Sequence, residues 1–114
     1  MKTLNGTEVA LEGTGFEARI ISGECRTSAT QLVQQSGVRC GVWECTPGSW
    51  ESSWTTWEIF TVLAGAGTLT DGDGIAHVLT PGAVVHIPEG SVGVWDVSET
   101  IRKSYVAPAK PPLN

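Results

Sequence analysis

The segment that decides the fold is EIFTVLAGAGTLTDGDGIAHVL, residues 58–79. Two runs rich in β-branched residues, EIFTVLAG at 58–65 and IAHVL at 75–79, lie on either side of TDGDG at 70–74. β-Branched residues favour the extended chain, and an Asp-Gly step supplies the positive φ that a tight hairpin requires. The segment therefore predicts two antiparallel strands joined by a short turn.

The same pattern continues on both sides of this hairpin. The runs EARII at 17–21, GVWEC at 41–45 and AVVHIP at 83–88 are short, and the chain's 14 Gly and 6 Pro punctuate such runs. The segment SATQLVQQ at 28–35 lacks an apolar stripe of period 3.6, so we expect a strand or irregular structure there. Regularly spaced short strands with Gly-rich turns predict an all-β fold, an antiparallel sandwich or barrel.

The length leaves room for one domain. A chain of 114 residues with 40% hydrophobic content can bury a core without disulfides and is too apolar for wholesale disorder. We expect an N-terminal arm with the first strands at 1–24, a barrel at 25–107 and a proline-rich surface tail at 108–114.

Charge and cysteine content exclude several classes of partner. Twelve acidic residues against seven basic ones give a net charge of -5, and no run of Lys or Arg could follow a phosphate backbone, so we expect no nucleic acid partner. An apolar run of about 18 residues is absent, and the start resembles no signal peptide, so we expect no membrane and a cytoplasmic location. Cys25, Cys40 and Cys45 form no CxxC pair and are expected to be reduced thiols.

Two motifs then indicate a family. PGSWESSWTTWEIFTVLAG at 47–65 carries a Glu followed by six residues and a Gly, the second half of the first cupin motif, and PGAVVHIPEGSVG at 81–93 carries the Gly, Pro and Gly of the second motif. From about residue 16 to 107 the chain resembles small cupins related to ureidoglycine aminohydrolase and the ethanolamine-utilisation protein Q. The resemblance implies a jelly-roll barrel, the double-stranded β-helix, with a small-molecule site at its open end, often in a homodimer.

The departures from these motifs concern the metal. Metal-binding cupins place three His and one Glu inside the barrel, and the positions that correspond to those His are Ser52, Trp54 and Gly93 here. Only Glu58 remains, and a single carboxylate does not hold a transition metal selectively, so we expect no metal cofactor. A nonstandard site built from Glu58, His86 and Cys45 is the alternative.

Glu58 is the first candidate catalytic residue. Buried among indoles without a metal, a carboxyl group loses solvation and becomes a candidate general acid or base. In ETIRKSYV, period 2 puts Lys103 and Tyr105 on one face of a strand, and the resemblance favours that face as the inner one. The alternative is a structural role for Glu58, with Glu44 as a second acidic candidate.

Aromatic residues supply the candidate binding surface. We assign substrate binding to Trp43, Trp54, Trp95 and His86, with core packing or an outward position as the alternative for each. Trp50, Trp54 and Trp57 all fall within one Ser-rich stretch of eight residues. Three indoles so close together favour a position at a pocket rim or in a dimer contact.

Two hypotheses about function follow. In the first, the protein is a metal-independent isomerase, lyase or aminohydrolase-like enzyme that uses Glu58 for proton transfer and Lys103 or Tyr105 to polarise a small-molecule substrate. In the second, it is a non-catalytic metabolite-binding or regulatory cupin with a Trp-lined cavity. In both it is expected to act as a homodimer.

Overall fold

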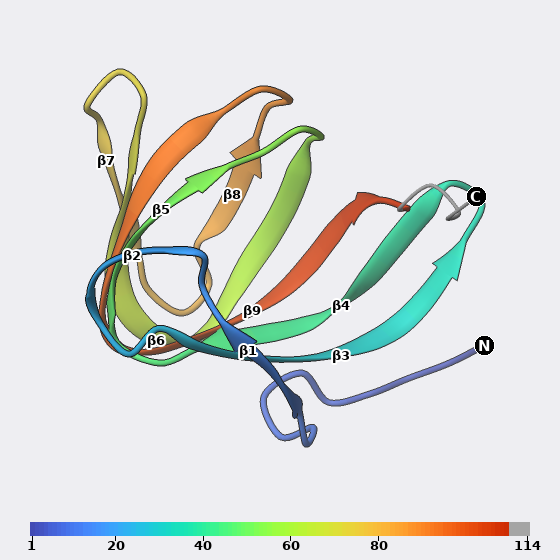
Figure 1. Ribbon diagram of the computed structural model, residues 1–114. Coiled ribbons are helices and arrows are strands. Elements are labelled where there is room, and N and C mark those ends of the chain that lie inside the picture. Colours follow the sequence, from blue (N-terminus) through green and yellow to red (C-terminus); the bar gives the residue numbers. More distant parts are fainter. Residues whose placement is uncertain (110–114) are drawn as a thin grey trace.

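The computed structural model describes residues 1–109, and the chain forms one antiparallel sheet that curls over on itself into a barrel (Figure 1). This confirms the predicted all-β jelly-roll fold. Within the described residues there is no helix long and apolar enough to cross a membrane. The strands are β1 (Glu12–Phe16), β2 (Arg19–Gly23), β3 (Arg26–Gln35), β4 (Val38–Cys45), β5 (Gly48–Ser53), β6 (Glu58–Asp71), β7 (Ala76–Leu79), β8 (Val84–Ile87) and β9 (Val92–Pro108).

Two long strands, β6 and β9, hold the barrel together by taking part in both of its walls. The first part of β6 pairs with β8 and with the end of β9, which also pairs with β4. The second part of β6 pairs with β7 and with the start of β9, which also pairs with β5. The two strands pair with each other along most of their length, so their bend creates the enclosed interior.

The bend in β6 depends on Gly65. The register between β6 and β9 shifts three times between Val62 and Gly67, and Gly65 has a φ of 96°. A Cβ at Gly65 would lie 2.2 Å from the Thr100 carbonyl oxygen. Glycine therefore meets both a backbone and a steric requirement at this point.

The predicted hairpin between β6 and β7 is confirmed. Asp71 closes the turn, because its Oδ1 accepts hydrogen bonds from the backbone N–H groups of Asp73 and Ile75 at 2.9 and 3.1 Å. Gly74 supplies the positive φ, 82°. The turn chemistry was thus readable from the Asp-Gly repeat.

The C-terminal end of the barrel differs from the expected boundary. Segment 28–35 forms part of β3, so the predicted strand is confirmed and the alternative of irregular structure is not. The predicted tail was expected to leave the sheet at residue 108, but Pro108 still pairs with Val38, and the Ala109 N–H donates to the Gly37 carbonyl at 2.9 Å. Proline is tolerated there because it ends the strand and its carbonyl remains an acceptor. The rest of that predicted tail, residues 110–114, lies outside the described residues.

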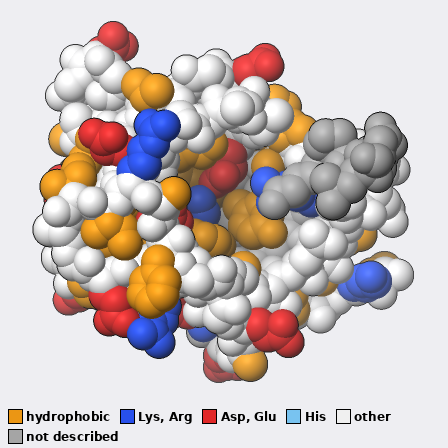
Figure 2. All heavy atoms as spheres, viewed as in Figure 1, with side chains coloured by type: hydrophobic (Ala, Val, Ile, Leu, Met, Phe, Trp, Pro, Cys, Tyr) orange, Lys and Arg blue, Asp and Glu red, His pale blue; other side chains and the backbone are white. Residues whose placement is uncertain are grey.

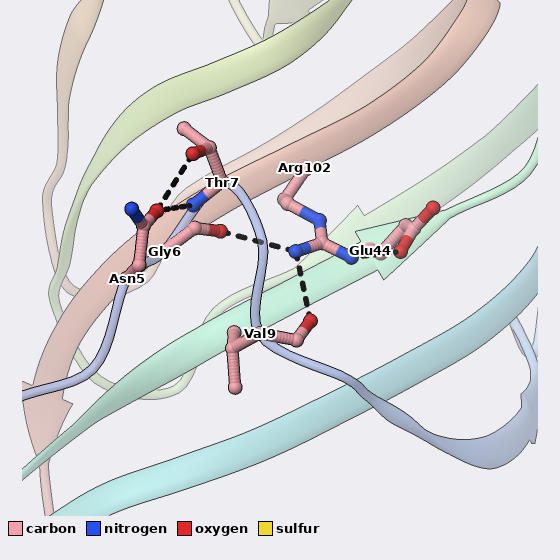
Figure 3. Close-up of polar contacts among 6 residues, drawn as sticks. All are labelled: Asn5, Gly6, Thr7, Val9, Glu44 and Arg102. Atoms are coloured by element: carbon pink, nitrogen blue, oxygen red, sulfur yellow. Dashed lines mark hydrogen bonds and ion pairs between the residues drawn. The ribbon is translucent and has the colours of Figure 1, made fainter.

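The N-terminal arm is fastened to the outside of the barrel by Arg102 (Figure 3). The Arg102 guanidinium donates to the carbonyls of Gly6 and Val9 at 3.1 and 3.0 Å and pairs with Glu44 at 3.1 Å. Glu44, the second acidic candidate, therefore lies on the outer face of β4 and serves to anchor the arm.

The core is aromatic, which corrects one expectation. Trp50 was expected at a pocket rim or a dimer contact. It does line the interior cavity, but as a core residue that is 1% exposed and stacks on Trp95 with ring centroids 5.4 Å apart and planes 12° apart. Phe60 stacks on the same Trp95 at 5.7 Å. Trp50 is buried because it lies within β5, whose alternation turns its side chain toward the interior.

We predict that Gly65→Ala destabilises the barrel more than Gly74→Ala does. Both positions have positive φ, so each substitution costs about 1 kcal/mol of backbone strain. At Gly65 the new methyl also meets the Thr100 carbonyl, which adds about 1–3 kcal/mol of overpacking, whereas nothing lies within 4 Å at Gly74. Urea denaturation of both variants measures the difference, and equal losses would refute this account of Gly65.

Candidate functional site

The barrel interior contains a cavity of about 500 Å³. Figure 2 shows a hollow in this face with acidic, basic and hydrophobic side chains inside it. Its walls come from β3, β4, β5, β6, β9 and the connection between β1 and β2. Four indoles share these walls with polar side chains, namely Glu17, Gln31, Gln34, Arg39, Ser52, Ser53, Glu58, Lys103 and Tyr105.

A buried ion pair lies at the centre of the cavity wall. Lys103 Nζ is 2.6 Å from Glu58 Oε2, and the two side chains are 8% and 14% exposed. Lys103 stands on β9 opposite Trp43 and Val62, on the inner face, with Tyr105 two residues further along the same face. The pair holds a proton donor and a proton acceptor in direct contact away from bulk water.

Three aromatic rings surround the Lys103 ammonium group. Its Nζ lies 4.5 Å from the ring centroid of Trp43, 4.6 Å from that of Phe60 and 5.2 Å from that of Trp95. Cations are attracted to the faces of such rings, most strongly where water is excluded. The rings and Glu58 together fix the ammonium in one position.

The other predicted site residues divide into two groups. Trp43, Trp54, Trp95 and Tyr105 all line the cavity beside the ion pair, and Trp54 is held by the hydrogen bond from its backbone N–H to the Ser91 carbonyl at 2.9 Å. His86 does not join them.

His86 lies on the outer face of β8, where it stands opposite Ile59. It borders a second pocket of about 320 Å³, together with His77, and residues of β6, β7, β8 and the start of β9 line that pocket. His77 Nε2 is 2.8 Å from Asp71 Oδ2, so the second histidine belongs to the hairpin turn. Neither histidine contributes to the main cavity.

Glu17 and Arg39 also line the cavity, and neither was predicted as a site residue. Glu17 precedes β2 and is bound through its backbone N–H to the Cys25 carbonyl at 2.9 Å. Burial raises the pKa of its carboxyl group above the ordinary value, and the nearby Lys103 charge opposes that rise. Glu17 could not be predicted because it lies in the connection between β1 and β2. Outside a strand, the period-2 alternation does not indicate which way a side chain points. Arg39 could have been found, since period 2 along β4 places it on the same face as Trp43.

The inner face of β5 carries Trp50 and Ser52, so Ser52, one of the two residues at the first-motif ligand positions, lines the cavity. β5 ends at Ser53, so Trp54 reaches the cavity from the following loop. Neither an indole nor a serine hydroxyl is a usual ligand for a transition metal. Glu58, the carboxylate that the motif retains, is already paired with the Lys103 ammonium, whose charge repels a cation.

The residues of the cavity therefore do not fit the metal site of metal-binding cupins. Within residues 1–109, no group of three or more His, Cys, Asp or Glu side chains could hold a metal ion. Glu58, His86 and Cys45, the alternative set, do not converge, because His86 is on the outer face. Cys45 is fully buried, and burial raises the pKa of its thiol to about 12, with the charge of Glu17 adding to the rise.

Comparisons with known proteins agree with this architecture. The chain matches the EutQ-like cupin domain over residues 32–105. The EutQ protein of Clostridium difficile is 22% identical with a TM-score of 0.66, over 74% of this chain and 68% of that one. The polyketide cyclase RemF of Streptomyces resistomycificus is 24% identical with a TM-score of 0.72, over 98% and 82%.

A third solved structure, a protein of unknown function from Pseudomonas syringae pv. tomato, is 21% identical with a TM-score of 0.80. The alignment covers 89% of this chain but 45% of that larger protein. No curated protein matches the sequence. These likenesses, all below 25% identity, show the fold.

The curled antiparallel barrel with its interior cavity defines a small cupin. The chain belongs to the EutQ-like cupin domain family, which confirms the resemblance to the ethanolamine-utilisation protein Q.

We predict that Lys103→Met lowers the free energy of unfolding by about 3–5 kcal/mol, because it leaves the Glu58 carboxylate buried without its cation. The double variant Lys103→Met with Glu58→Gln should regain much of this loss. Arg26→Met is the control, since Arg26 and Glu24 form an exposed pair and its loss should cost less than about 1 kcal/mol. Urea denaturation measures all three, and a single variant as stable as the control would contradict the structural role of the ion pair.

Proposed function

We propose that this protein is a metal-independent small-molecule enzyme that transfers a proton on its substrate, with Glu58 as the base and Lys103 as the polarising group. The observation that carries the proposal is the 2.6 Å contact between Glu58 and Lys103 in the wall of a 500 Å³ cavity. Cavities of this size hold a small organic molecule.

The pair is suited to removing a proton next to a carbonyl group. The Glu58 carboxylate accepts the proton from carbon, and the Lys103 ammonium stabilises the negative charge that develops on the carbonyl oxygen. Such stabilisation is strongest where the donor is already fixed and water is excluded, and both conditions hold for an ammonium enclosed by three rings. Tyr105, on the same face of β9, is a second candidate donor to the substrate oxygen.

The half-buried indoles of Trp43 and Trp54 favour a flat substrate. Both line the cavity and both lie within 6.5 Å of Trp95, measured between ring centroids, so they form a continuous aromatic wall. A planar molecule can stack on such a wall. RemF, which shares the fold, is a polyketide cyclase, and this likeness supports an organic substrate in the barrel.

Hydrogen exchange at carbon tests the proposal without knowledge of the natural substrate. A panel of aromatic ketones and β-diketones is incubated with protein in deuterated water, and exchange next to the carbonyl is followed by NMR. We expect exchange with the wild type, and a loss of about 10²- to 10⁴-fold in Glu58→Gln, because the base is removed. Glu44→Gln is the matched control, since Glu44 pairs with Arg102 on the outer face.

Two outcomes would contradict the proposed enzymatic function. Exchange that survives in Glu58→Gln would remove Glu58 from the chemistry, and exchange that a chelator abolishes would show a metal-dependent reaction. If no member of the panel exchanges although members bind, the second hypothesis gains support, a non-catalytic metabolite-binding cupin in which the Lys103–Glu58 pair serves binding alone.

We also propose that the protein acts as a homodimer through the outer face of β8, β6 and β9. Three apolar side chains are exposed there on neighbouring strands, Val84 at 69%, Ile59 at 41% and Val106 at 37%, and Ile59 stands directly opposite Val106. Apolar residues grouped on one face commonly mark a protein contact.

The dimer predicts a mass of about twice 12.0 kDa by light scattering at micromolar concentration. Val84→Lys should shift the equilibrium to the monomer, because it would bury a charge in the contact. Val78→Lys is the control, since Val78 is similarly exposed, at 65%, on β7 of the other wall. A wild-type mass near that of one chain would refute the dimer.

A further inference from the structure

Arg39 stands at one end of the cavity, and no carboxylate among residues 1–109 forms an ion pair with it. It lies on β4 two residues from Gly41 and four from Trp43, so all three share the inner face. Within residues 1–109, none of the four ion pairs includes Arg39. A cationic group that lines a cavity and lacks a counter-charge is available to a ligand.

The orientation of Arg39 is nevertheless fixed by its neighbours. Its Nε donates to the Pro108 carbonyl at 3.3 Å, and its guanidinium carbon lies 5.4 Å from the centroid of the Tyr105 ring. These two contacts hold the guanidinium plane and leave the terminal Nη1 and Nη2 groups without a hydrogen-bond partner among the described residues. Two parallel N–H donors are the arrangement that binds a carboxylate in bidentate fashion.

Polar side chains of β3 complete this end of the cavity. Gln34 stands opposite Arg39 and Gln31 stands opposite Gly41, and both line the cavity. Residues three apart share a side of a strand here because the register between β3 and β4 shifts between Gln31 and Val33. The bulge therefore turns two amide groups toward the space beside the guanidinium.

The other end of the cavity is aromatic and contains the Lys103–Glu58 pair. Trp43 and Lys103 stand opposite each other, four residues along β4 from Arg39, which corresponds to a separation of about 13 Å along the strand. Between these two ends Tyr105 lines the cavity, and its hydroxyl lies against Gly41, 3.0 Å from where a Cβ would be. A flat molecule with an acidic group at one end can span this distance.

We infer that the cavity binds planar aromatic carboxylates, with the acid group on Arg39 and the rings against Trp43 and Trp54. This rests on the proposed function only in placing the substrate in the same cavity, since it concerns binding and not turnover. Arg39 attracts the acid group more strongly than Lys103 does, because the Lys103 charge is already balanced by Glu58 at 2.6 Å.

Titration calorimetry with naphthalene carboxylate and its uncharged amide tests the inference. The two probes have nearly the same shape, so a difference in affinity reports the charge. We expect the carboxylate to bind about tenfold or more tightly than the amide, as charge-assisted hydrogen bonds exceed neutral ones. The indole N–H signals of Trp43 and Trp54 should shift in NMR spectra on binding.

Two arginine variants locate the anion. Arg39→Gln should weaken binding of the carboxylate about 10- to 100-fold and leave binding of the amide nearly unchanged, while Arg39→Lys should lie between, because it keeps the charge and loses the paired donors. Arg26→Gln is the matched control, since Arg26 also lies over an aromatic ring, Phe16 at 5.3 Å, but does not line the cavity. Circular dichroism verifies that the variants are folded.

The inference is overturned if the amide binds as tightly as the carboxylate, if neither probe binds, or if Arg39→Gln leaves carboxylate affinity unchanged. None of these results bears on the hydrogen-exchange experiment, in which Glu58 is varied and turnover is measured. Failure of the substrate class and failure of the proton-transfer chemistry are therefore separate outcomes.

Discussion

The buried contact between Lys103 and Glu58 is the interaction on which the interior of this barrel depends. Both charges have left water, and each would be costly alone, so the strands that carry them, β9 and β6, must keep one register. The aromatic rings around Lys103 do not replace its hydration but add attraction to an ammonium already paired. The same contact organises the cavity, because it sets a base and an acid side by side in its wall.

The metal site of many cupins and the ion pair seen here are alternative solutions to one problem, a carboxylate in a barrel interior. Where histidines and a metal are present, the metal cation balances the Glu charge. Here Ser52, Trp54 and Gly93 offer no ligands, and a lysine provides the positive charge instead. At Gly93, the second-motif ligand position, the Trp54 ring lies 3.6 Å from where a Cβ would be.

The outside of the same strands is organised by a second, independent pair. Arg102 and Lys103 are neighbours on β9, and strand alternation sends one outward to Glu44 and the N-terminal arm and the other inward to Glu58. The outer pair anchors a segment of chain and the inner pair shapes a site. Two adjacent basic residues thus have separate roles, which a count of charges does not reveal.

The sequence by itself determined the strands, the Asp-Gly hairpin, the family and the inward face shared by Lys103 and Tyr105, because turn chemistry and period 2 are local properties of the chain. It did not determine that Trp50 is core, that His86 faces outward, or that Glu17, Gln31 and Gln34 line the cavity. Those depend on where β5 ends, which face of β8 is inner, how a turn folds over the barrel and where a bulge shifts β3. Only the tertiary structure decided them, since contacts between residues far apart in the chain select the register, and a shift of one residue exchanges the two faces of a strand.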